Sequence, residues 1–248
     1  MTESVVVAAF WGAFAASSLV IGAVLAVRVR LSNRVVGSVM GFGAGALIGG
    51  IAYELVPKYL FSDAGSGILV AFAVGALTFF VCDWVIDSRG GRHRKDIGSP
   101  RPPAGGSGMA IFLGTLLDGI PESLTLGLGL ALGGSISVAF LAAVFVSNLP
   151  EGIAGTKNML AEGAPRRRVL WMWIGLLMAA AAAAAVGYAF VQAVPGIDGR
   201  LVQGFAAGAM LTMLADAMMP EAFEHGGKVV GLLTTLGFLM AAILSVLE

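Results

Sequence analysis

Charged side chains are scarce in this sequence. Of its 248 residues only 12% are charged and 58% are hydrophobic, whereas roughly 25% of an average soluble domain is charged. The mean hydropathy is +0.91. The fifteen basic and fifteen acidic residues cancel, so no excess charge favours nucleic acid as a partner. This composition excludes an ordinary soluble domain and predicts an all-α membrane protein embedded in a lipid bilayer.

Cysteine and histidine are also nearly absent. The single cysteine, Cys82, excludes an intrachain disulfide and a cysteine-based metal cluster. No basic region precedes the first apolar run, which therefore predicts a retained span rather than a cleaved signal peptide. No Ser/His/Asp set, phosphate loop or zinc-protease motif is found, so neither an enzymatic activity nor a cofactor is expected.

Eight apolar stretches are long enough to cross a bilayer as helices. Polar or glycine- and proline-rich segments separate them, and the longest of these, 87–108, is expected to be a cytoplasmic loop. The sequence thus predicts one transmembrane domain, 1–248, with spans at about 4–26, 35–56, 67–86, 109–130, 135–157, 169–192, 201–219 and 228–247.

The positions of lysine and arginine predict the orientation. With eight spans and both termini outside, thirteen of the fifteen basic residues fall in inward-facing loops, and only Lys58 and Arg200 face outward. Cytoplasmic loops are enriched in lysine and arginine. The same split supports the number of spans, because the loss of one helix would scramble the alternation.

An internal repeat relates the second and seventh expected helices at an offset of 163 residues. Aligning 41–57 with 204–220 pairs seven identical residues, among them Phe42 with Phe205 and Pro57 with Pro220. Glycine and alanine tracts also match by chance in membrane helices. The two related helices would cross the membrane in opposite directions, so we expect a 3+2+3 arrangement with an inverted repeat and a site near its symmetry axis.

Two similar polar tracts interrupt the fourth and fifth expected helices. Asp118 and Glu122 are four residues apart and lie on one helix face, and Asn148 and Glu151, three apart, share a face of the next. A proline precedes each glutamate and leaves a backbone carbonyl without its usual helical donor. No lysine or arginine lies in the middle of a span, so either a metal or protons must compensate these acids. Oxygen ligands of this kind bind divalent cations.

Four other residues are weaker candidates for the path of an ion. Glu54 and Asp216 lie near the ends of the two related helices and could line an entrance or exit, or simply reach water. His225 stands beside two glutamates and could form a metal landing site, or belong to a plain polar loop. His93 lies in a basic stretch that suits anionic lipid.

With these features the sequence resembles the ZIP (Zrt/Irt-like) metal transporters, especially their short bacterial branch. The resemblance rests on eight spans, a long loop after the third, and Pro-Glu pairs on the fourth and fifth helices. It implies a mononuclear or binuclear divalent-metal site between those helices, an elevator-like movement of metal toward the cytoplasm, and frequent homodimers. It also implies zinc as the substrate, and the short chain suggests a bacterial inner membrane.

Carried over by position, the resemblance makes five residues metal ligands or their neighbours. Glu122, Asn148 and Glu151 match residues of the family. Asp118 stands where histidine is common, and Ser147 where histidine, glutamine or glutamate is common. The loss of imidazole leaves an oxygen-rich site that favours manganese, iron(II) or another harder ion over zinc.

Two alternatives use the same residues without moving a metal. In a proton-coupled carrier or proton conductor the acids would titrate, and flux would not respond to chelators. In a non-transporting metal sensor, metal would stabilise the fold without any flux.

Overall fold

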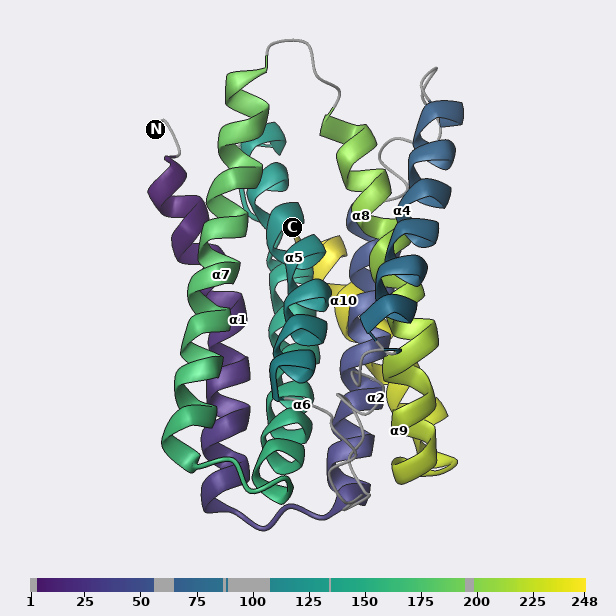
Figure 1. The fold of residues 1–248 in the computed structure, drawn as a ribbon. Helices are drawn as coiled ribbons and strands as arrows, with labels where there is room; N and C mark the ends of the chain where they lie inside the picture. Colours follow the sequence, from purple (N-terminus) through teal and green to yellow (C-terminus); the bar gives the residue numbers. More distant parts are fainter. Residues whose placement is uncertain (1–3, 56–64, 87, 89–107, 134, 195–198) are drawn as a thin grey trace.

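The fold is a bundle of long helices that run side by side (Figure 1). In this computed structural model, residues 4–55, 65–86, 88, 108–133, 135–194 and 199–248 are described. Every regular element among them is helical, so the predicted all-α class is confirmed. Most of the expected cytoplasmic loop 87–108, including His93, lies outside the described residues, as does Lys58.

Eight helical segments form the described bundle, and each overlaps one of the eight expected spans. Two of them, the second and the seventh, contain a π turn (η). The bounds are α1 (Val5–Arg28), α2 (Asn33–Gly50) with η1 (Ile51–Leu55), α4 (Gly65–Ile86), α5 (Gly108–Gly133), α6 (Val138–Ala161), α7 (Arg166–Ala193), α8 (Gly199–Met213) with η3 (Leu214–Met218) and α9 (Met219–Gly226), and α10 (Val229–Leu247).

Counted over the described residues alone, seven of the segments, all but α5, are long and apolar enough to cross a membrane. These helices identify a multi-pass membrane protein. Helix α5 carries two carboxylates near its middle and packs against α7. That 109–130 also crosses the membrane remains a prediction.

The seventh segment is longer than the sequence predicts. The expected span ended at 219 and left Pro220 to Lys228 as a loop, but helix α9 continues to Gly226. Pro220 falls in the first turn of α9, where a missing N–H is tolerated. Gly227, with a φ of 69°, ends the helix in a conformation that favours glycine. The glutamates and His225 expected in a loop therefore lie on a helix.

Burial separates central from peripheral helices. In the apolar windows of α2 and α6, 67% and 72% of the residues are buried, compared with 17% in α4 and α10. The exposed side chains of α4 and α10 are largely apolar, for example Leu77, Phe80 and Leu232. Such surfaces suit contact with lipid.

Glycines allow the two helices of the sequence repeat, α2 and α8, to pack closely against the peripheral helices α10 and α4. A Cβ added at Gly45 of α2 would collide with the backbone carbonyl of Thr234 on α10, and one at Gly208 of α8 with that of Phe72 on α4. Thr234 also donates its Oγ1 to the carbonyl of Gly41, at 3.1 Å. Glycine at these positions therefore lets the helices pack backbone against backbone.

The same helix contacts occur twice in the bundle, once in each half of the sequence repeat. Helix α2 packs on α10 as α8 packs on α4, and α1 packs on α6 as α7 packs on α5. The two π turns, η1 and η3, begin at Ile51 and Leu214, which differ by the 163-residue offset of the sequence repeat. Both chain ends lie in the upper half of Figure 1, and the α1–α2 and α6–α7 connections at its lower end.

Candidate metal centre

All five residues singled out on the fourth and fifth helices are buried. Asp118 and Glu122 on α5 are each 2% exposed, Ser147 on α6 is fully buried, and Asn148 and Glu151 are each 5% exposed. Three carboxylates inside a largely apolar bundle are costly unless their charge is compensated. The burial gives the bundle an acidic interior contributed by α5 and α6.

Both helices run unbroken through their prolines. Pro121 lies inside α5 and Pro150 inside α6, so the i, i+4 and i, i+3 spacings hold and each pair of polar residues shares a face. The hydroxyl of Thr125 donates to the carbonyl of Pro121 at 2.8 Å.

Asn148 reaches the α5 side of the bundle. It lines a small cavity of about 20 Å³ together with Gly119 and Ser123 of α5, which is room for about one water molecule. Gly119 is open enough that an added Cβ would meet nothing within 4 Å. The structure thus brings the amide of α6 to the α5 residues adjacent in sequence to Asp118 and Glu122.

Ser147 points elsewhere. Its hydroxyl donates to the carbonyl of Val144 at 2.9 Å. Its backbone lies against α2, since a Cβ added at Gly43 would come within 2.8 Å of the Ser147 Cα. Consecutive helical residues are about 100° apart, so Ser147 and Asn148 face different neighbours. The assignment of Ser147 as a ligand remains a prediction.

A larger polar pocket lies at the end of the bundle that holds the last residue, Glu248. Its volume is about 240 Å³, and its lining includes Glu54, Gln203, Glu248 and Thr125. Ser245 donates to Glu54 at 2.6 Å, and the backbone N–H of Ala139 donates to Glu248 at 2.6 Å.

Of the two acids expected near an entrance, Glu54 lines this pocket and is 7% exposed. Asp216 lies in η3, is exposed, and is not among the residues lining the pocket. Sequence reasoning missed Gln203, although an amide inside an expected apolar span was a usable signal.

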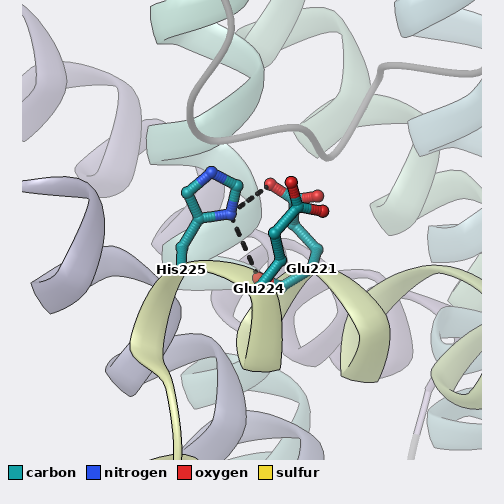
Figure 2. Close-up of side chains that lie close together, drawn as sticks. All are labelled: Glu221, Glu224 and His225. Atoms are coloured by element: carbon teal, nitrogen blue, oxygen red, sulfur yellow. Dashed lines mark hydrogen bonds and ion pairs between the residues drawn. The ribbon is translucent and has the colours of Figure 1, made fainter.

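A second group of side chains that could hold a metal ion lies on α9, toward the lower end of Figure 1. One potential ligand atom from each of Glu221, Glu224 and His225 lies within 4.8 Å of the others. Figure 2 shows the His225 Nδ1 beside the Glu221 carboxylate, at 3.0 Å. One imidazole and two carboxylates suit zinc, yet the ion pair of His225 with Glu221 also explains the arrangement.

Fold and site together define a class: a multi-pass helical membrane protein with an acidic interior on two adjacent proline-containing helices. No protein-family model matches the chain. A curated protein of Arabidopsis thaliana, named "Putative zinc transporter", is 26% identical over 212 residues, which are 83% of this chain and 33% of that protein. The chain therefore spans about a third of the length of this relative. The similarity supports the resemblance to ZIP metal transporters drawn from the sequence.

Proposed function

We propose that this protein moves divalent metal cations across a membrane toward the cytoplasm. Asp118, Glu122 and Glu151 are the principal ligands, and Asn148 with Ser147 tunes geometry and selectivity. The observation that carries the proposal is the burial of all five polar side chains on α5 and α6, inside a bundle of apolar helices. The similarity to a zinc transporter supports a metal as the substrate.

The chemistry of the ligands bears on which metal is carried. Three carboxylates and an amide are oxygen donors, which suit manganese, iron(II) and magnesium-like ions better than an imidazole would. The relative favours zinc. We therefore propose zinc as a substrate, with manganese, iron(II) and cadmium as competitors.

The architecture supports a 3+2+3 inverted repeat with α5 and α6 at its centre. Equivalent helix pairs pack alike, and the two π turns repeat at the same offset as the sequence. Inverted repeats place a substrate site between their halves. Helices α1, α5, α6 and α7 pack mainly among themselves, which suits an elevator-like movement of this group against the remainder.

The cellular setting follows from the resemblance and from the basic residues. We propose that both termini face outward, that the chain resides in a bacterial inner membrane as a single transmembrane domain, and that it forms homodimers. The apolar outer surfaces of α4 and α10 support embedding in lipid.

The test is metal uptake into proteoliposomes. Zinc, manganese, iron(II) and cadmium are offered in competition to the intact chain and to Glu122→Gln/Glu151→Gln, which retains side-chain volume and removes two charges. We expect the double variant to lose at least about tenfold in metal flux, since each lost carboxylate weakens a divalent site by more than about 1 kcal/mol. Glu162→Gln, at an exposed position just after α6, is the matched control and should retain flux.

The same vesicles separate the alternatives. Proton flux that persists in the presence of a chelator, without any metal uptake, would identify a proton conductor. Metal-dependent thermal stability without any flux would identify a sensor. Unchanged metal uptake by the double variant would contradict the proposal that Glu122 and Glu151 bind the transported metal.

A further inference from the structure

The polar pocket beside Glu248 contains a buried acceptor that no described donor satisfies. Oε1 of Gln203 has no hydrogen-bond partner within the described part of the chain, and the Gln203 side chain is 4% exposed. A buried polar atom without a hydrogen-bond partner destabilises a fold. Such an atom in the wall of a polar pocket indicates a bound water or ion.

Two carboxylates share this pocket with the amide. Glu54 is held by the Ser245 hydroxyl, and Glu248 by the N–H of Ala139 in the first turn of α6. A carboxylate offers about four acceptor sites, so a carboxylate that already accepts a hydrogen bond can also bind a cation. No lysine or arginine is among the described residues lining the pocket. The lining thus offers negative charge and oxygen atoms to a bound ligand.

We propose that this pocket is a second divalent-cation site, in which Glu54, Glu248 and the Gln203 amide oxygen hold an ion that keeps part of its water shell. Carboxylate and amide oxygens are the ligands of hard divalent ions, and such ions often retain waters. The pocket volume of about 240 Å³ is larger than that of a bare ion and leaves room for several water molecules.

The pocket stands directly along α5 from the acidic interior. Thr125 and Gly129, which line it, are three and seven residues beyond Glu122. At 1.5 Å per residue these positions lie about 4.5 and 10 Å along the helix. Leu55, Leu126 and Phe140 line the same pocket and are nearly fully buried. They give it an apolar inner wall.

This position makes the pocket a waiting site for an ion that next enters the acidic interior. That role in transport rests on the proposed function, whereas binding at the pocket does not. With two carboxylates against three, the waiting site should bind more weakly than the interior site.

The test uses Mn²⁺ as the probe, with binding to purified full-length protein in nanodiscs followed by electron paramagnetic resonance. The background is Glu122→Gln/Glu151→Gln, so that the interior site is disabled. We expect one Mn²⁺ per chain, weakened at least tenfold by Gln203→Leu and by Glu54→Gln. Gln203→Glu should tighten binding by adding a charge. Gln192→Leu, at an exposed glutamine on α7, is the matched control and should leave binding unchanged.

Three outcomes would overturn the inference: no Mn²⁺ bound to the double variant, binding that is insensitive to Gln203→Leu in a folded chain, or no tightening by Gln203→Glu. Uptake by the unaltered chain is measured in parallel. Pocket binding without uptake would contradict the proposed function alone, and uptake without pocket binding would contradict this inference alone.

Discussion

Asp118 stands where the ZIP transporters, which the sequence resembles, commonly have histidine. It is 2% exposed and lies one helical turn before Glu122 on α5. A carboxylate at this position supplies charge and a hard oxygen, whereas an imidazole would supply a neutral, softer nitrogen. Under the proposed function, the side chain at this one position therefore influences which metal is preferred.

Asp118→His should shift selectivity toward zinc. We expect the ratio of zinc to manganese uptake to rise about tenfold, which corresponds to about 1.4 kcal/mol. Competition uptake with both ions in the same proteoliposomes measures this ratio. Asp118→Asn is the control: it removes the charge without adding imidazole, and should lower uptake of both ions without favouring zinc. An equal response of the two variants would contradict the assignment of Asp118 as a ligand.

At the scale of the helices, glycine decides how closely the elements approach. Gly45 and Gly208 occupy equivalent places in the sequence repeat, and each faces a backbone carbonyl of a neighbouring helix, α10 for one and α4 for the other. A side chain at either position meets backbone, which cannot rotate away. Membrane helices rely on such contacts because lipid supplies no hydrophobic driving force between them.

Gly45→Ala and Gly208→Ala should each destabilise the folded bundle by about 1–3 kcal/mol, as overpacking does in a close-packed core. Thermal unfolding of purified protein in detergent measures the change. The control is Gly231→Ala on α10, where the nearest atom to an added Cβ, Cζ of Phe223, is 4.0 Å away. There alanine should be neutral or stabilising by up to about 1 kcal/mol. Equal effects at all three glycines would contradict the close-packing argument.

At the scale of the whole molecule, the bundle has two distinct ends. The polar pocket with Glu54 and Glu248 lies at one end, and the Glu221, Glu224 and His225 group at the other, with the acidic interior between them. The distribution of basic residues in the sequence predicts that the pocket end faces outside.

Cysteine labelling in intact cells tests this orientation. On a Cys82→Ala background, Val194→Cys at the end of α7 and Glu162→Cys after α6 mark opposite ends, and both positions are exposed. We expect a membrane-impermeant maleimide to label the first and not the second, and permeabilised cells to label both. The reverse pattern would contradict the proposed direction of transport as well as the topology.

Helix positions were largely predictable because apolar runs separated by polar segments mark spans directly. The prediction was wrong where η3 and α9 carry the seventh segment past Pro220 to Gly226. A proline ordinarily signals the end of a helix, but here it falls in a first turn, where its missing N–H does no harm. Local sequence alone did not distinguish these two cases.

The burial of Asp118, Glu122, Asn148 and Glu151 agrees with their placement in apolar runs. The divergence between Ser147, which lies against α2, and Asn148, which reaches the α5 cavity, was not predictable. Which neighbour a helical residue faces depends on the rotation of the whole helix, and packing against several partners sets that rotation.

By itself the sequence determined that this protein is a bundle of membrane helices with carboxylates at its centre, because apolar length and residue spacing act locally. Only the tertiary structure decided that Glu54, Gln203 and Glu248 share one pocket. These three residues come from α2's π turn, the start of α8 and the residue after α10. No pattern along the chain joins them, since their proximity arises only when the ends of five helical segments pack together.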